Sequence, residues 1–318
     1  MTGVSAGKRP AGEVSVRSAG GFRLSHVPQL GGKVTSLRYG ESGRQWLAAP
    51  VRPLAVPSRA DQPWGELDCS GWDECFPNVG SRHRLALLDH GEVWRHPWHH
   101  EAAGAECGDA PGVSGWVCPP GREYRFNRDI RTLGSRLDIT YRIDNSADEP
   151  LPWAWAQHLL LAADERTRLV LPAPARMRLD SAFWHGRPHQ DLRWLLRDDE
   201  LASSTRLDRS RGHAAKLWFT RPLPPIVAVV NGSDWLAWRI GQSTPTALGL
   251  WVNLGGWGEH AMGHVAVEPA FGANDDPLLA YAESSALDAG QSHLWRVVIE
   301  AGTGLAELDV LLHDGRLW

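Results

Sequence analysis

Three titratable side chains lie on or beside stretches of the sequence that otherwise resemble β-strands. His90 is in LLDHGEVW, His158 is in the apolar run WAWAQHLLLAAD, and Glu268 follows an apolar stretch in HVAVEPAFGANDD. A buried carboxylate is costly unless it is paired or used in chemistry. A carboxylate and an imidazole have different pKa values, so one can stay basic while the other is partly protonated. Together the three residues indicate acid and base catalysis, whereas each one alone fits a structural hydrogen bond or ion pair.

The segment 87–98, LLDHGEVWRHPW, combines acids, histidines, an arginine and tryptophans. The whole chain has 17 tryptophans against 6 phenylalanines and 4 tyrosines. An indole offers a broad apolar face and one N–H donor, which suits both a protein core and the C–H face of a sugar ring. We expect most of the tryptophans in the core.

Signatures of metal or cofactor chemistry are weaker. His96, His99 and His100 cluster in RHPWHHE, but strand alternation would send neighbours to opposite faces, and no carboxylate or cysteine stands at ligand spacing. No G-x-S-x-G, P-loop or dinucleotide fingerprint occurs. We therefore expect no metal and no organic cofactor. The loop 255–260, GGWGEH, is expected either to connect two strands or to form one rim of a pocket.

Alternation with a period of two residues dominates the chain and predicts antiparallel β-strands. In SRLDITYRIDN, for example, Leu137, Ile139 and Tyr141 share one face, and polar residues occupy the other. Asn231 and Gly232 stand between two β-prone runs and predict a hairpin. Further strands are expected at 13–18, 22–27, 33–40, 123–132, 215–220, 246–254 and 293–302.

Helical patterns are few. NDDPLLAYAESS, residues 274–285, predicts a short helix that is capped by Asn274 or Asp275 and has Pro277 in its first turn. DLRWLLRDDELASS, residues 191–204, indicates a second helix. Turn signals are frequent, and neither a repeat nor a linker marks a boundary. We therefore predict an all-β chain in which a disordered segment 1–12 precedes a single large antiparallel β-sandwich over 13–318.

Composition limits the location and the partners. The 318 residues carry a formal net charge of −4 with scattered basic residues, whereas nucleic-acid binding needs a basic surface. No apolar signal core or membrane-length apolar run occurs. Cys69, Cys75, Cys107 and Cys118 have no CxxC spacing, and a chain of this size does not need disulfides. We expect reduced thiols in a soluble, cytoplasmic protein that binds neither nucleic acid nor membrane.

An ordered set of motifs resembles the aldose 1-epimerase (galactose mutarotase-like) superfamily, in a divergent branch. The motifs are GGKVTSLRYG, SGWDECFPNVG, LLDHGEVW, WAQHLLLA and HVAVEPAFGANDDP, and the resemblance runs from about residue 20 to residue 300. It implies a large antiparallel β-supersandwich with few short helices, whose concave sheet holds an aldose. It also implies that His158 is the general acid at the ring oxygen, that Glu268 is the general base at the anomeric hydroxyl, and that His90 holds or polarises the sugar. On this basis we expect His90 and Trp94 to face the sugar from the concave sheet, and Asp89 and Glu92 to orient the imidazole or to face solvent.

This assignment fits the chemistry of anomer exchange. Opening a hemiacetal needs one proton removed at the C1 hydroxyl while another reaches the ring oxygen, so an acid and a base must flank the sugar. Rotation about the C1–C2 bond and closure on the opposite face then complete the reaction without a cofactor.

The chain departs from the family in its other ligand-binding residues. Classical members carry a substrate-binding arginine upstream of the HG histidine, and Arg59, Arg82 and Arg84 all stay open for that role. A further acid that binds sugar hydroxyls is open between Asp180 and Asp234.

Two alternatives to a free-hexose epimerase stay open at this point. An epimerase for a phosphorylated hexose would need basic side chains such as Arg82, Arg84 and Arg95 to converge on the pocket. A carbohydrate-binding protein on the same scaffold would need no acid and base pair. In either case Trp72 and Asp73 of SGWDECFP are expected to touch the ligand, as the divergent branch implies. A small sugar is the expected partner, and a homodimer stays open.

Overall fold

The structure is a computed structural model. It describes residues 12–17, 21–101, 110–171, 176–189, 196–197, 200–201, 204–207, 212–240, 245–258 and 262–314. The predicted disordered segment 1–12 lies outside these residues except for Gly12, and Cys107 also lies outside them. In the described part, no helix combines the length and the apolar character needed to cross a membrane.

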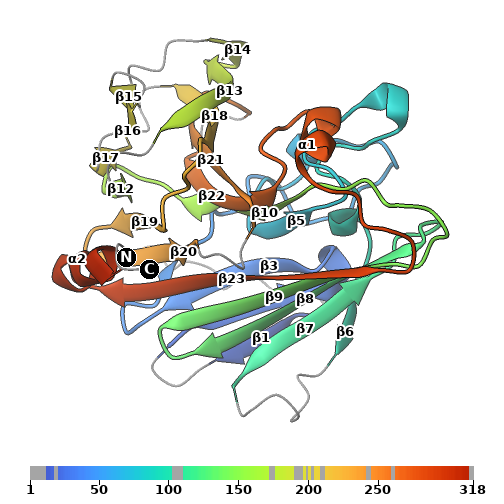
Figure 1. Cartoon of the computed structure of the whole chain (residues 1–318). Helices are drawn as coiled ribbons and strands as arrows, with labels where there is room; N and C mark the ends of the chain where they lie inside the picture. The colour runs from blue at the N-terminus through green and yellow to red at the C-terminus, as the bar shows by residue number, and fades with distance from the viewer. Residues whose placement is uncertain are drawn as a thin grey trace.

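Two large antiparallel sheets pack against each other within these residues (Figure 1). The first sheet has 12 strands; it begins behind the second sheet and rises above it (Figure 1). Its spatial order is β1 (Val14–Arg17), β2 (Arg23–Val27), β3 (Lys33–Tyr39), β5 (Trp72–Cys75), β10 (Trp155–Leu159), β22 (His264–Phe271), β21 (Ala247–Leu254), β18 (His213–Phe219), β13 (Met177–Trp184) and β14 (Arg187–Pro188), with β4 (Arg44–Gln45) beside β3 and β11 (Leu161–Ala162) beside β22.

The second sheet has nine strands in the described part of the chain, and a further two-stranded sheet pairs β15 (Leu196–Arg197) with β16 (Glu200–Leu201). The order of the nine is β17 (Ser204–Arg206), β12 (Thr167–Val170), β19 (Ile226–Asn231), β20 (Asp234–Arg239), β23 (Ser292–Thr303), β9 (Arg136–Asn145), β8 (Tyr124–Leu133), β7 (Gly112–Val117) and β6 (His99–Glu101).

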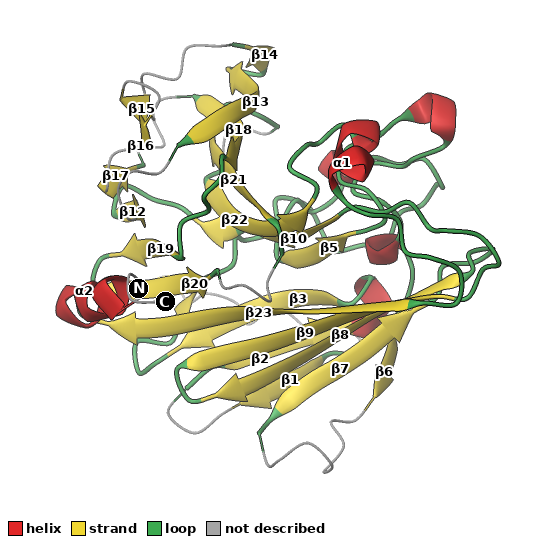
Figure 2. Cartoon of the chain, in the orientation of Figure 1, coloured by secondary structure: helices red, strands yellow, loops and turns green. Residues whose placement is uncertain are grey.

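Helices are short and lie at the margins of the sheets, as Figure 2 shows. They are the 3₁₀ turns η1 (Pro28–Leu30), η2 (Trp64–Glu66), η3 (His83–Leu85) and η4 (Val93–Arg95), and the α-helices α1 (Pro277–Glu283) and α2 (Leu305–Asp314). The predicted antiparallel β-supersandwich with few short helices is therefore confirmed.

The core between the sheets follows from the alternation in the sequence. On β9, Leu137, Ile139, Tyr141 and Ile143 are completely buried, while Arg142 between them is exposed. Burial of aliphatic and aromatic side chains from both sheets contributes about 25 cal/mol per Å² of apolar surface, and this favours the packed pair of sheets. The predicted hairpin also forms, with Asn231 of β19 facing Asp234 of β20.

Four local predictions need correction. The segment 191–204 is not a helix where it is described, because β15, β16 and the start of β17 lie in it. The cap of α1 is Asp276, whose side chain accepts from Leu278 N, with Pro277 in the first turn as predicted. Residues 87–98 form turns and η4 rather than a strand. Glu268 lies inside β22 rather than after it. The helix α2 had no counterpart among the predicted elements.

Candidate functional site

Strand register brings the two predicted catalytic residues to one face of the first sheet. His158 on β10 faces Asp73 on β5. On its other side, Ala156 of β10 faces Ala270 of β22, and β11 pairs with β22 in that same register. Continuing this register places His158 opposite Glu268. Because side chains opposite each other on neighbouring strands point to the same face, all three polar groups share the outer, concave face of the sheet.

A pocket of about 200 Å³ opens on this face. Small residues follow the polar row on the same face, with Cys75, Ala156 and Ala270 on neighbouring strands. Gly249 faces Glu268, and a Cβ at Gly249 would lie 3.2 Å from Glu268 Oε2. The residues that line the pocket are Trp64, Val79, Gly80, Asp89, His90, His158, Ser181, Phe183, Lys216, Trp251, Trp257, Glu268 and Asp275.

A buried lysine binds the predicted base. Lys216 Nζ, on β18, forms a close ion pair with Glu268 Oε2 and lies 3.7 Å from Asp275 Oδ1. Burial by itself would lower the pKa of Lys216, but the Asp275 and Glu268 carboxylates outweigh it and raise that pKa. Burial raises the pKa of Asp275 to about 6, although Lys216 opposes the change. The site therefore holds a permanent cation between two acids.

The two histidines meet at an aromatic corner. The rings of His90 and His158 are 4.7 Å apart, and Trp64 stacks on His90 at 5.2 Å while its ring meets His158 edge to face at 4.7 Å. Trp64 is fixed at both ends, because its Nε1 donates to Asp73 Oδ2 at 3.0 Å and its backbone N–H donates to Asp89 Oδ2 at 3.0 Å.

The electrostatic surroundings separate the two imidazoles. Burial would lower the pKa of His90, but the adjoining Asp89 carboxylate, helped by Asp275 and Glu268, raises it above its ordinary value. Burial lowers the pKa of His158 well below its usual range, and the charge of His90 and Lys216 lowers it further. Of the two imidazoles, His90 therefore holds a proton more readily than His158.

A tight turn presents His90 to the pocket. His90 N–H donates to Val79 O at 2.7 Å, and Glu92 N–H donates to Phe76 O at 2.7 Å. His90 and Gly91 both have positive φ, 58° and 70°. At Gly91 a Cβ would stand 2.2 Å from Phe76 O, so only glycine fits there. The backbone of this turn therefore requires glycine directly after His90, independently of any role of the imidazole.

Tryptophans form a further part of the lining. Trp251 and Trp257 meet edge to face at 6.0 Å, and Trp251 Nε1 donates to His264 Nε2 at 2.9 Å. Trp257 belongs to the predicted rim loop 255–260, and it does line the pocket. His260 at the end of that loop lies outside the described residues.

Trp72 and Asp73 lie on opposite faces of β5, because the side chains of adjacent strand residues point in opposite directions. Trp72 is completely buried in the core between the sheets, and its Nε1 donates to Glu74 Oε1 at 2.9 Å. The prediction that it touches the ligand does not agree with this position. Asp73 faces the His158 side but is not part of the lining, and its Oδ2 accepts from Lys33 Nζ at 2.9 Å as well as from Trp64. Asp73 therefore fixes the position of the Trp64 indole and does not itself line the pocket.

Three other predicted ligand contacts lie away from the pocket. Trp94 is buried beside Trp64 and Cys69 in a small cluster, and its Nε1 donates to Asp89 O at 3.3 Å. Arg59 is half exposed and pairs with Asp61 and Glu66 at the surface. Arg84 is exposed on η3 and does not line the pocket.

The remaining basic and acidic candidates are also engaged elsewhere. Arg82 binds Asp276 at 2.7 Å, beside the first turn of α1. Arg95 donates to the carbonyls of Gly91, Ala60 and Gln62. Neither arginine lines the pocket.

The two open acids differ in their distance from the site. Asp234 is on β20 of the other sheet and accepts from Thr303 Oγ1 at 2.9 Å. Asp180 precedes the lining residue Ser181 on β13, and it acts on the Asp275 carboxyl through its charge. Between the two, Asp180 is the acid at the pocket edge.

The clustered histidines and the cysteines lie apart from the pocket or behind it. His99 stacks on Trp116 at 3.9 Å on the edge strand β6. Within the described ranges, no group of three or more His, Cys, Asp or Glu residues could hold a metal ion. Cys75 and Cys118 are free thiols, and the Cys69 thiol donates to Gly65 O.

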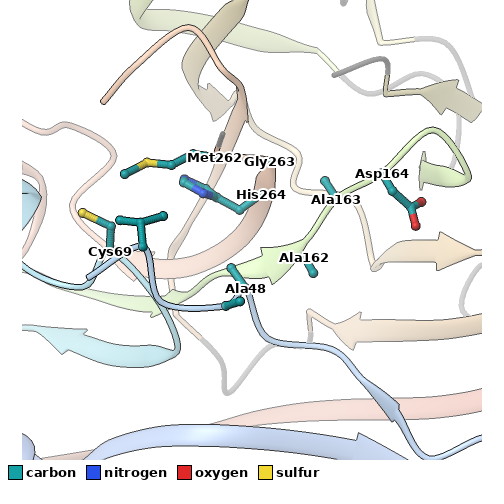
Figure 3. Close-up of a pocket in the computed structure, with 10 residues that line it drawn as sticks. Ala48, Cys69, Ala162, Ala163, Asp164, Met262, Gly263 and His264 are labelled. Atoms are coloured by element: carbon teal, nitrogen blue, oxygen red, sulfur yellow. The ribbon is translucent and has the colours of Figure 1, made fainter. Parts of the chain in front are cut away.

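A second hollow, of about 270 Å³, is lined in part by His264, the residue that Trp251 of the first pocket contacts. Figure 3 shows Cys69, Met262 and His264 at one end of it and Asp164 at the other. Burial lowers the pKa of His264 to about 4, so this imidazole is neutral and accepts from Trp251 Nε1. The Asp164 carboxylate is already bonded to Asn231 and Thr167.

Sequence reasoning missed Lys216, Asp275, Trp64 and Trp251. Lys216 gave one signal, because in AKLWFT it interrupts an apolar strand at a position where a lysine is rarely buried. Asp275 was considered only as a helix cap. Trp64 and Trp251 gave no separate signal, because the chain has 17 tryptophans.

Replacing Lys216 by Met is expected to lower the free energy of unfolding by about 3 to 5 kcal/mol, because the buried Glu268 carboxylate would lose the cation that pairs with it. Urea unfolding measures the loss. Lys216→Arg keeps the charge and is the matched control. A Lys216→Met protein as stable as the wild type would contradict the assigned role of the ion pair.

The fold has known counterparts among solved structures. The Slr1438 protein from Synechocystis sp. PCC 6803 is 18% identical with a TM-score of 0.66, covering 95% of this chain and 100% of its own. A galactose mutarotase-like protein from Lactobacillus casei ATCC 334 is 13% identical with a TM-score of 0.63, covering 92% and 100%. A galactose mutarotase related enzyme from Lactobacillus acidophilus is 12% identical with a TM-score of 0.65, covering 92% and 98%.

These similarities establish the architecture. The chain has the galactose mutarotase-like fold, as its sequence resemblance predicted. No protein-family model and no curated protein matches the chain.

Proposed function

We propose that the protein is an aldose 1-epimerase, an isomerase that interconverts the α and β anomers of a free hexose or a related sugar. The observation that carries the proposal is the position of His158 opposite Glu268 in one strand register, on the wall of one pocket that His90 also lines. This arrangement supplies an imidazole and a carboxylate to the same bound ring.

The proposed reaction needs only side chains of this chain. Glu268 accepts the proton of the C1 hydroxyl while an imidazole gives a proton to the ring oxygen, and the bond between C1 and the ring oxygen breaks. Rotation about C1–C2 exposes the other face of the aldehyde. The ring oxygen then attacks C1, the imidazole takes its proton back, and Glu268 returns a proton to the C1 oxygen. The family resemblance gives the acid role to His158.

Charge in the pocket favours an uncharged sugar over a phosphorylated one. Among the described residues that line it, Lys216 is the one lysine or arginine, and it already lies between Glu268 and Asp275. Arg82 and Arg95 are bound elsewhere. A hexose-phosphate epimerase would need free cations that converge on the phosphate.

A non-catalytic sugar-binding protein is the remaining alternative. Binding alone does not require an acid and a base beside the anomeric carbon, and ligand-facing tryptophans would be enough. The pairing of His158 with Glu268 therefore favours the enzyme. We also propose a cytoplasmic location, which the free thiols of Cys75 and Cys118 support.

Polarimetry tests the proposal directly. Freshly dissolved α-glucose and α-galactose lose optical rotation at a known uncatalysed rate, and the protein is expected to accelerate that decay in proportion to its concentration. Hexose phosphates measured in the same way test the rival substrate class. If no sugar, phosphorylated or free, equilibrates faster with the protein than without it, the epimerase proposal is wrong and a binding function gains support.

A further inference from the structure

The two imidazoles of the site are not equivalent as proton donors, and His158 is the less suited of the two. Its Nδ1 is buried and has no hydrogen-bond partner among the residues that the structure describes. An imidazolium carries a proton on both ring nitrogens. Protonated His158 would therefore bury a charged N–H donor with nothing to accept it, which is unfavourable. The neutral form with its proton on Nε2 leaves Nδ1 as an unpaired acceptor instead, but it buries no charge.

His90 Nδ1 also lacks a directed hydrogen bond among the described residues, but unlike His158 it has a carboxylate beside it that can pair with an imidazolium. Its Nδ1 lies 3.0 Å from Asp89 Oδ1, an ion-pair distance, although the angle is poor for a directed hydrogen bond. Asp89 cannot easily turn away, because its other oxygen accepts from Trp64 N–H. The indole of Trp64 stacks on the His90 ring at 5.2 Å, and an aromatic face stabilises a cation. With Nδ1 against Asp89, Nε2 is the nitrogen left for a ligand.

The other charges around the pair act in the same direction. Asp275 and Glu268 contribute negative charge near His90, while Lys216 and Lys33 contribute positive charge near His158. The charge of Arg95 lowers the pKa of Asp89, and Arg95 influences His90 only through this carboxylate. With the two imidazole rings 4.7 Å apart, a proton on one disfavours a proton on the other.

We propose that His90 is the general acid of the epimerase reaction, and that His158 acts as a neutral Nε2–H donor that holds the sugar. This inference rests on the proposed function. His90 Nε2–H gives its proton to the ring oxygen as the bond to C1 breaks, and Glu268 takes the proton of the C1 hydroxyl. On closure each proton returns to its donor. Asp89 is a positioning residue that keeps His90 charged. The family resemblance gives the acid role to His158, whereas in this chain His90 has that role.

The experiment combines a titration and a pH profile. The ring nitrogens of ¹⁵N-histidine-labelled wild type are followed by NMR from pH 5 to pH 9, and the signals are assigned with His90→Gln and His158→Gln. Glutamine keeps an N–H donor but cannot act as an acid, so the two substitutions are matched. The rates of anomer exchange for these variants and for Asp89→Asn are measured over the same range after subtraction of the uncatalysed rate.

His90 is expected to titrate above pH 6.5, while His158 stays neutral with its proton on Nε2. A general acid loses activity when it loses its proton, so wild type should have a basic limb set by His90. His90→Gln should lower kcat about 10²–10⁴-fold with little change in KM and abolish that limb. His158→Gln should raise KM and retain the limb, and Asp89→Asn should move the limb to lower pH.

The opposite pattern overturns the inference. If His158 titrates at the higher pH, or if its glutamine variant loses the basic limb while His90→Gln retains it, His158 is the acid. The titration needs no substrate, and one folded variant is enough, because the signal that the variant lacks assigns that histidine in the wild type. It also separates the two proposals, because an inactive protein with a charged His90 would contradict the proposed function and leave the protonation assignment standing.

Discussion

Glu268→Gln is expected to lower the catalysed rate of anomer exchange by about 10²–10⁴-fold, because an amide cannot accept the proton of the C1 hydroxyl. The substitution keeps the size of the side chain. The amide oxygen of the glutamine can still accept a hydrogen bond from Lys216, which in the wild type donates to Glu268. The pocket should therefore keep its shape. Polarimetry of fresh α-galactose at several protein concentrations measures the effect.

The matched control is Glu300→Gln. Glu300 is also an ion-paired glutamate on a strand, with its Oε1 2.8 Å from Arg239 Nε, but it lies on β23 of the other sheet. This variant should retain the wild-type rate. A Glu268→Gln protein that folds normally and keeps more than about a tenth of the wild-type rate would show that another group removes the proton.

Arg128→Met is expected to cost about 3 to 5 kcal/mol of the free energy of unfolding, which is the usual effect of breaking a buried ion pair. Arg128 and Glu74 are both buried between the sheets, and Arg128 Nη1 donates to Glu74 Oε1 at 3.0 Å. Glu74 also accepts from the indoles of Trp72 and Trp155 and from the hydroxyl of Tyr141. Without the arginine, a carboxylate would stay in the core with neutral donors only. Urea unfolding measures the loss.

The double variant Arg128→Met with Glu74→Gln provides the control for this prediction. Removing both charges leaves no unpaired ion in the core, so the double variant should be more stable than Arg128→Met alone. Burial raises the pKa of Glu74 to about 7 even beside Arg128, which agrees with a costly charge at this position. If the single and the double variant are equally stable, Arg128 stabilises the protein by something other than its ion pair with Glu74.

Much of the fold could be predicted because its signal is local. The alternation of Leu137, Ile139 and Tyr141 with polar residues is visible in a few consecutive positions, and the strand that it predicts is the strand that forms. The same holds for the hairpin at Asn231. Helical propensity failed for 191–204, where the described residues pair as short strands, because tertiary context overrides a weak local preference.

The site was predictable only in part, and the reason is geometric. His90, His158 and Glu268 were found because titratable residues are rare in apolar strands, and all three line one pocket. Trp72 was misassigned because composition does not say which face of a strand a residue occupies. Its neighbour Asp73 shares the face of His158, and the two-residue period sends Trp72 to the core.

What the sequence by itself determined is the set of strands, their apolar faces and three reactive side chains, since each depends on neighbours in the chain. Only the tertiary structure decided which groups meet. Lys216 reaches Glu268 across one intervening strand, β21, and 52 positions of sequence. Asp89 lies against His90 only because a tight turn with positive φ at His90 presents both. Charge on a buried group depends on distances of a few ångströms, and those distances are set by the packing of segments far apart in the chain.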